Sequence, residues 1–156
     1  MKKILLTSFT FIILCSVLIT GCGKKKEVSP YEKAVQEFTD NITAYGNEID
    51  SLDVNNPDSK TQLLASLDKM NDCFKTMQEY NAPEKYQACD EIIEKAAGFM
   101  DQANVLYHQA LEAEVFDSVL YESARAQYNE AMKYASYMGQ ALMGQDIIVS
   151  QNQVNE

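Results

Sequence analysis

Apolar side chains recur at alternating steps of three and four residues along most of the chain after residue 30. The first stripe comprises Tyr31, Val35, Phe38, Ile42, Tyr45, Ile49 and Leu52. This spacing places side chains on one face of an α-helix. Ser29 suits the N-cap position, and Pro30 suits the first helical position, where a missing N–H costs nothing. The pattern therefore predicts a helix from residue 30, with its last turns weakened by Gly46.

Three further stripes follow the first. The second comprises Leu63, Leu67, Met70, Phe74 and Met77. The third comprises Tyr86, Cys89, Ile93, Ala96, Met100, Ala103, Tyr107 and Ala110. The fourth comprises Tyr121, Ala124, Tyr128, Ala131, Ala135, Met138 and Leu142. Each stripe predicts one amphipathic helix with an apolar face to bury.

Turn-forming residues separate the stripes. Asp58 or Ser59 can cap the second helix, and Pro83 suits the first turn of the third. Asp117 suits the N-cap of the fourth helix, and Gly144 suits its C-terminal cap. Phe116 and Tyr121 are spaced to pack across the N-cap of the fourth helix as a hydrophobic staple.

Four amphipathic helices joined by short connections bury their apolar faces against each other. We therefore expect an all-α protein, an antiparallel up-down-up-down four-helix bundle over residues 30–149. A flexible polar tail is expected over residues 150–156. Few glycines and prolines and no tryptophan agree with helix rather than sheet.

The first 21 residues have the three parts of an export signal. Lys2 and Lys3 precede an apolar run from Ile4 to Ile19, which is shorter than the roughly 20 residues of a typical membrane-spanning helix. The run ends in Ile19, Thr20, Gly21 and Cys22. This segment resembles the lipobox of bacterial lipoproteins. The resemblance implies that Ile19, Thr20 and Gly21 are recognised by the signal peptidase and that Cys22 is lipidated. An ordinary signal peptide and an uncleaved helix are the alternatives.

Residues 22–29 are expected to form a lipidated, lysine-rich tether. Two acyl chains on Cys22 would hold the protein firmly at the cell membrane, because one chain alone gives only marginal attachment. Anionic head groups would attract the lysines that follow, Lys24, Lys25 and Lys26. The alternative is that these lysines only begin a solvated linker.

Charge narrows the range of partners. The predicted signal removes two lysines and no acids, so the formal net charge changes from −10 to −12. A body this acidic is not expected to bind nucleic acid. The remaining 135 of the 156 residues suffice for one domain with a core.

Cysteine usage suggests a crosslink. Cys15 would leave with the signal and Cys22 would carry lipid, so Cys73 and Cys89 remain as an even pair outside the cytoplasm. In a hairpin that turns at residues 81–82, the two lie at similar heights. We therefore hypothesise a disulfide between them; the alternative is two buried thiols that act as small hydrophobes.

The chain lacks the usual signatures of catalysis. His108 is the one histidine, so a di-iron site built from two Glu-x-x-His elements is excluded within one chain. A haem held by His108 and a methionine is arithmetically allowed, although methionines at helical spacing usually fill cores. No P-loop, dinucleotide fingerprint or Gly-x-Ser-x-Gly motif is present. We expect a non-enzymatic protein without cofactor or metal.

Tyrosine is the unusual excess, with nine residues. Most of these tyrosines fall on the predicted helix seams, where rings fill the core and hydroxyls reach the rim. Tyr134 and Tyr137 are the candidates for contact with a ligand.

The lipobox, the Leu63–Tyr80 helix, the Ala82-Pro83-Glu84 turn and the segments that begin at Tyr107 and Tyr128 together resemble small clostridial-type Gram-positive surface lipoproteins. The resemblance implies a location on the extracytoplasmic face of the cell membrane and a helical fold, and it transfers no catalytic residue. The leading hypothesis is a module that binds an envelope protein or a peptidoglycan-associated partner through an exposed helix face. The alternatives are a bundle with an internal ligand pocket lined by Tyr and Met, and an envelope enzyme without a recognisable motif.

Overall fold

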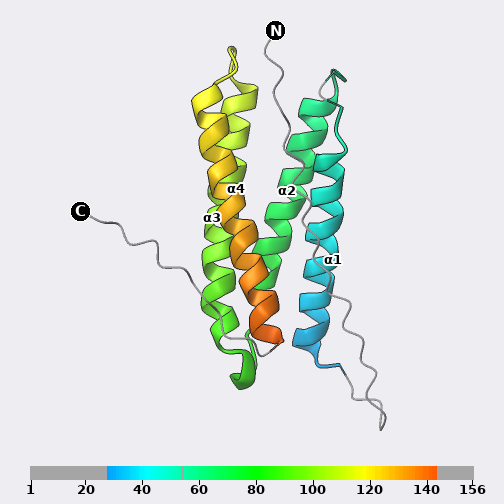
Figure 1. The fold of residues 1–156 in the computed structure, drawn as a ribbon, viewed down its shortest axis with the longest axis vertical. Helices are drawn as coiled ribbons and strands as arrows, with labels where there is room; N and C mark the ends of the chain where they lie inside the picture. The colour runs from blue at the N-terminus through cyan, green and yellow to red at the C-terminus, as the bar shows by residue number, and fades with distance from the viewer. Residues whose placement is uncertain (1–27, 54, 144–156) are drawn as a thin grey trace, which may run out of the picture.

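Four α-helices lie along one long axis in the computed structural model, which describes residues 28–53 and 55–143 (Figure 1). The helices are α1 (Pro30–Asp50), α2 (Ser59–Gln78), α3 (Ala88–Glu112) and α4 (Ser118–Leu142), with a short 3-10 helix, η1 (Glu84–Tyr86), before α3. Successive helices run in opposite directions (Figure 1). The expected all-α, up-down-up-down four-helix bundle is therefore confirmed.

The bundle has two distinct ends (Figure 1). The start of α1, the η1 connection and the end of α4 lie at the lower end. The α1–α2 and α3–α4 connections lie at the upper end. Because a helix rises 1.5 Å per residue, the 25 residues of α3 separate the two ends by about 37 Å. The start of α1 therefore lies far from the α3–α4 connection.

Two helix starts follow the predicted capping chemistry. The Ser29 hydroxyl accepts a hydrogen bond from the Glu32 backbone N–H (3.1 Å), and the Glu32 carboxylate accepts one from the Ser29 N–H (3.0 Å). The Asp117 carboxylate accepts hydrogen bonds from two backbone N–H groups in the first turn of α4. Phe116 and Tyr121 meet edge to face with ring centroids 5.5 Å apart, as the expected staple. Gly144 lies outside the described residues.

Two other helix starts differ from expectation. Asp58 occupies the N-cap of α2 without a side-chain hydrogen bond. The Ser59 hydroxyl instead donates to the backbone carbonyl of Asp53, at 2.6 Å. Pro83 has an extended backbone and precedes η1, so α3 begins at Ala88 rather than near Pro83. The chain between α2 and α3 is therefore longer than a tight helical hairpin turn.

The two aspartate caps form a matched pair for a stability test. Replacing Asp117 with Ala removes two hydrogen bonds to the first turn of α4 and should lower the free energy of unfolding by about 0.5–2 kcal/mol. Asp58→Ala removes no such bond and should change it by less than about 0.5 kcal/mol. Urea unfolding of both variants measures the difference, and equal losses would contradict the assignment of the caps.

The core is continuous and apolar in the described residues. Its largest fully buried side chains are Phe74, Ile42, Leu67, Met70, Met77, Met100, Met138 and Cys89. Helices α3 and α4 pack most extensively against each other. Tyr128 of α4 lies near Asp50, the last residue of α1. Burial of the Tyr128 hydroxyl and, to a smaller extent, the charge of the Asp50 carboxylate raise the pKa of Tyr128 to about 12.

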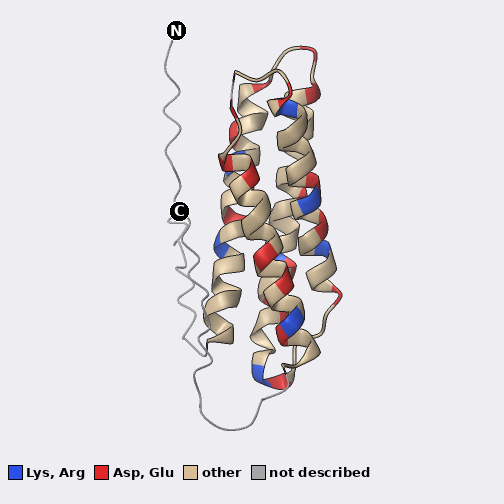
Figure 2. Ribbon diagram, turned by 90° about the vertical axis from the view of Figure 1, so that its right-hand side faces the viewer, with Lys and Arg blue, Asp and Glu red and all other residues tan. Residues whose placement is uncertain are grey.

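Charged residues are distributed along the helices and on the connections between them (Figure 2), and none of those in the described part of the chain is buried. Within the described part of the chain, the buried polar side chains are Ser66 and Asn71. The Ser66 hydroxyl donates to the Glu48 carboxylate at 2.9 Å, and the Asn71 amide donates to Asp101 at 3.2 Å. The surface is thus the place to search for function.

Candidate functional site

A groove of about 280 Å³ lies between α1 and α2. Helix α1 contributes residues spaced three and four apart, so that they share one face: Ala34, Glu37, Phe38, Asn41 and Tyr45. Helix α2 contributes Lys69, Asp72, Cys73, Thr76, Met77 and Tyr80. Buried Phe38 and Met77 form its apolar floor, and exposed polar residues form its rim. The groove combines an apolar base with charged edges.

The Cys73 thiol is half-buried in this groove. Burial raises its pKa, and the negative charges of Asp72 and Glu37 raise it further. A thiol in this setting is kept protonated and is a weak nucleophile at neutral pH. The groove therefore offers Cys73 as a neutral lining group and not as a catalytic thiolate.

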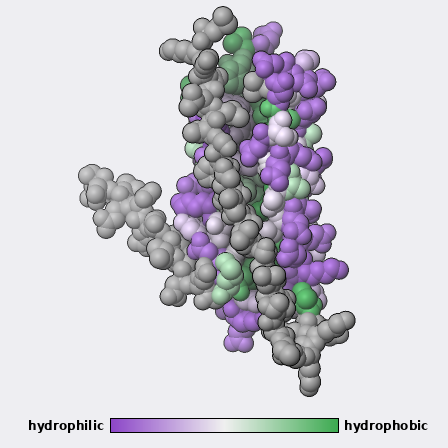
Figure 3. Space-filling view, turned by 45° about the vertical axis from the view of Figure 1, so that its right-hand side comes forward, coloured by the Kyte–Doolittle hydropathy of each residue, from purple (hydrophilic) through white to green (hydrophobic). Residues whose placement is uncertain are grey.

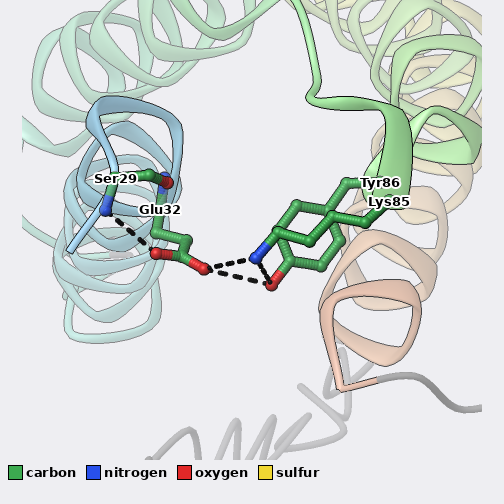
Figure 4. Close-up of polar contacts among 4 residues, drawn as sticks. All are labelled: Ser29, Glu32, Lys85 and Tyr86. Atoms are coloured by element: carbon green, nitrogen blue, oxygen red, sulfur yellow. Dashed lines mark hydrogen bonds and ion pairs between the residues drawn. The ribbon is translucent and has the colours of Figure 1, made fainter. Parts of the chain in front are cut away.

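A second polar cluster closes the lower end of the bundle (Figure 4). The Glu32 carboxylate on α1 reaches across to η1, where the Lys85 ammonium lies at 3.0 Å and the Tyr86 hydroxyl at 3.1 Å. Hydrogen bonds from the Ser29 backbone and from Lys85 lower the pKa of Glu32 to about 2. Tyr86 also stacks on Tyr31. These contacts tie the start of α1 to the α2–α3 connection, which is a structural role.

His108 belongs to a polar seam between α2 and α3. Its Nε2 atom lies 3.0 Å from the Asp68 carboxylate, and its Nδ1 atom lies 3.2 Å from the Glu112 carboxylate. Asp68 also accepts a hydrogen bond from Asn104 at 2.9 Å. Both ring nitrogens are therefore engaged, which leaves neither one to coordinate a haem iron or to accept a proton from a nucleophile.

The His108–Asp68 pair should give stability a defined pH window. Burial acts to lower the pKa of His108, but the hydrogen bonds that its ring donates to the Asp68 and Glu112 carboxylates raise it above the ordinary 6.5. Burial acts to raise the pKa of Asp68, but Asn104 and His108 lower it below 3.8. The stability that protonated His108 contributes is fully present below pH 6.5 and is lost as pH rises through the pKa of His108 in the folded protein. The stability that ionised Asp68 contributes is fully present above pH 3.8 and is lost as pH falls through the pKa of Asp68 in the folded protein.

We therefore expect His108→Gln to lower the free energy of unfolding most between pH 3.8 and pH 6.5. The loss should be at most about 1 kcal/mol, because His108 and Asp68 are both partly exposed. The cost should shrink at about pH 9, where wild-type His108 is neutral. Lys95→Gln is the control, because it removes the exposed Glu91–Lys95 pair, whose groups do not titrate in that range. Urea unfolding at about pH 5.5 and pH 9 makes the comparison. A cost of His108→Gln that is the same at both values would rule out this linkage.

The expected disulfide is not formed, because Cys73 and Cys89 are both free. Cys73 faces the α1–α2 groove near Glu37 and Asp72. Cys89 is fully buried in the core, beside the Tyr31 hydroxyl. The η1 turn separates α2 from α3, so the two cysteines do not face each other as they would across a tight hairpin. The alternative interpretation, two thiols that pack as small hydrophobes, describes Cys89 well.

The structure brings Tyr134 and Tyr137 together but keeps them apart from the groove. Their rings meet edge to face at 5.6 Å, and Tyr134 stacks on Phe99 of α3 at 5.5 Å. Both are half-buried. They therefore form part of the aromatic packing between α3 and α4. The predicted signal and lipidation residues, Ile19 to Cys22, and the lysines that follow lie outside the described residues.

The α3–α4 connection and the first turn of α4 carry exposed apolar side chains. Val115 is 81% exposed, Val119 is 74% exposed and Phe116 is 56% exposed. We call these three residues the apolar tip. The space-filling view shows hydrophobic surface at this end of a largely hydrophilic face (Figure 3). Asp117 predicts the start of α4 from the sequence, but the exposure of the neighbouring apolar residues depends on where other helices end and is not predictable from it.

The groove was likewise missed from the sequence. Glu37 and Asp72 lie beside the apolar stripes, where periodicity indicates only solvated helix faces. Their relation to one another depends on the packing of α1 against α2. Glu37 precedes buried Phe38, and Asp72 precedes half-buried Cys73. This adjacency was the only signal of the groove in the sequence.

Comparison with known proteins adds no relative: no family model, curated protein or solved structure matches the chain. Among the described helices, none combines the length and apolarity that crossing a bilayer requires. No group of three or more metal-ligating side chains is found within residues 28–53 and 55–143.

Proposed function

We propose that the protein is a lipid-anchored lipoprotein of the extracytoplasmic membrane face, whose bundle is a non-enzymatic module that binds an envelope protein through the apolar tip. The partner would present an apolar pocket with a basic rim. The observation that carries this proposal is the exposure of Val115, Phe116 and Val119 at the end of the bundle opposite the start of α1.

The lipid anchor would set the orientation of the bundle relative to the membrane. Acylation at Cys22 would tether the lower end of the bundle, because α1 begins there (Figure 1). The eight residues of the tether, 22–29, span at most about 28 Å when fully extended. With the tether at the lower end, α3 carries the apolar tip about 37 Å further from the attachment point. The tip is then the part of the bundle best placed to reach a partner.

The chemistry of the tip favours a protein over a bilayer. Acidic residues lie close to it in the sequence: Glu112, Glu114, Asp117 and Glu122. Anionic head groups would repel these carboxylates. An apolar centre with a charged rim is the usual composition of a protein interface. Exposed valines and a phenylalanine at one point are typical of interaction sites and are otherwise an aggregation hazard.

The anchor is tested by mass spectrometry of the protein purified from its own membrane. We expect a mature chain that begins at acylated Cys22, and we expect Cys22→Ser to retain its leader and to carry no acyl chain. An intact leader on the wild-type protein, or an unmodified Cys22 thiol, would contradict the anchor.

The module is tested by photo-crosslinking in intact cells. A photoreactive residue at position 115 should give one discrete adduct with an envelope protein, and the same residue at exposed position 84, on η1 at the lower end, should not. Phe116→Asp together with Val119→Asp should abolish the adduct and lower the free energy of unfolding by no more than about 1 kcal/mol, through loss of the Phe116–Tyr121 contact. Equal adducts from both positions, no adduct from position 115, or an adduct that survives the double substitution would count against the proposal.

A further inference from the structure

The α1–α2 groove is a second surface feature, lined by both helices and separate from the apolar tip on the α3–α4 connection. Its volume of about 280 Å³ is near the lower limit of small-molecule sites. Phe38 and Met77 give it a buried apolar floor, and Phe74 packs edge to face on Phe38 beneath, at 5.0 Å. An aliphatic chain of a few carbon atoms fits such a floor.

Two carboxylates line this groove. Glu37 comes from α1 and Asp72 from α2, on either side of the half-buried Cys73 thiol. Within the described part of the chain, neither is paired with a cation. Two unpaired carboxylates beside an apolar floor attract a positive group, and the strongly acidic chain adds to the attraction.

The aromatic walls of the groove favour a cation, and Lys69, the one lysine among the described residues of its lining, lies over the Tyr45 ring. Tyr45 and Tyr80 both line the groove, and aromatic faces attract ammonium groups. Lys69 already lies over the Tyr45 ring, with its Nζ atom 5.5 Å from the centroid. That ring is therefore occupied, which leaves Tyr80 as the aromatic wall available to a ligand. A hydrated metal ion would gain nothing from the apolar floor, and an anion would meet both carboxylates.

We propose that this groove binds a small free alkylamine, with its ammonium group between Glu37 and Asp72 and its aliphatic stem on Phe38 and Met77. The inference does not rest on the proposed function, because it concerns other helices and another class of ligand. A lysine side chain of a peptide has the same chemistry, so the test separates the two sources.

The binding test uses the full-length chain in a non-ionic detergent and n-butylammonium as the probe, followed by NMR or calorimetry. We expect saturable binding of n-butylammonium and none of butyrate. Glu37→Gln with Asp72→Asn should weaken binding at least about tenfold. The control, Glu94→Gln with Asp58→Asn, changes the net charge equally outside the groove and should leave the affinity unchanged. Tighter binding of Nα-acetyl-lysine amide than of n-butylammonium would overturn the free amine in favour of a lysine side chain.

Alkylation of Cys73 reports independently on where the ligand binds. A ligand on the groove floor should slow alkylation of Cys73 by iodoacetamide at least about threefold, followed by mass spectrometry of the tryptic peptide 70–75. Butyrate should not slow it. Cys89, which is fully buried in the core, should stay unalkylated with and without ligand and so shows that the protein remains folded. No binding of n-butylammonium, equal losses in the groove and control variants, or no protection of Cys73 at saturation would overturn the proposal.

Discussion

Phe74→Ala is expected to lower the free energy of unfolding by about 3–5 kcal/mol, the range for truncation of a buried phenylalanine. Phe74 is 0% exposed, and its ring packs edge to face on Phe38, with centroids 5.0 Å apart. The substitution removes apolar surface from the core and leaves a cavity between α1 and α2 that rigid helices fill poorly. Urea unfolding followed by circular dichroism measures the loss.

Phe116→Ala is the matched control. Phe116 is exposed and contacts Tyr121 in the staple across the N-cap of α4. Its truncation removes that contact but opens no cavity, so the expected loss is below about 1 kcal/mol. Similar losses in the two variants would show that Phe74 is not a core residue of the bundle in solution.

Local signals explain why so much of the fold was predictable. Helical periodicity and capping chemistry act within a few residues, so Ser29 and Asp117 mark the starts of α1 and α4 from the sequence alone. The same stripes provide nearly all of the core, because an amphipathic helix has only one face to bury. The up-down order then follows from the short connections.

Features that depend on helix rotation were not predictable. Cys73 and Cys89 occupy similar heights in a simple hairpin, but η1 and the rotation of the helices point Cys73 to a surface groove and Cys89 into the core. The three-residue η1 carries no periodic signal of its own. Height along a helix follows from counting residues, whereas facing direction across a connection does not.

The same limit applies to the candidate sites. The pairing of His108 with Asp68 joins residues on different helices, so no local sequence motif predicts it. The groove carboxylates, Glu37 and Asp72, also come from different helices. By contrast, the prediction of a ligand contact at Tyr134 and Tyr137 rests only on the high tyrosine content of the chain. The structure places both rings in aromatic packing with Phe99.

Fully buried alanines recur along α3 and α4, the two helices that pack most extensively against each other. Along α3 and α4 the fully buried alanines recur every seven residues, at Ala96, Ala103 and Ala110 on α3 and at Ala124 and Ala131 on α4. The distance between packed helices depends on the side chains at the contact, so small residues allow the closest approach. This seam explains why α3 and α4 pack more extensively than any other pair.

Enlarging one of these alanines should therefore force the helices apart. Ala131→Leu inserts three carbon atoms where the side chain is 0% exposed, and we expect a loss of at least about 1–3 kcal/mol in the free energy of unfolding. Ala126→Leu adds the same atoms to an exposed position of the same helix and should have little effect, because alanine and leucine have similar helix propensities. Thermal and urea unfolding of both variants provide the measurement. A stable Ala131→Leu protein would mean that the seam has room for larger side chains, and that close approach of the backbones does not hold α3 against α4.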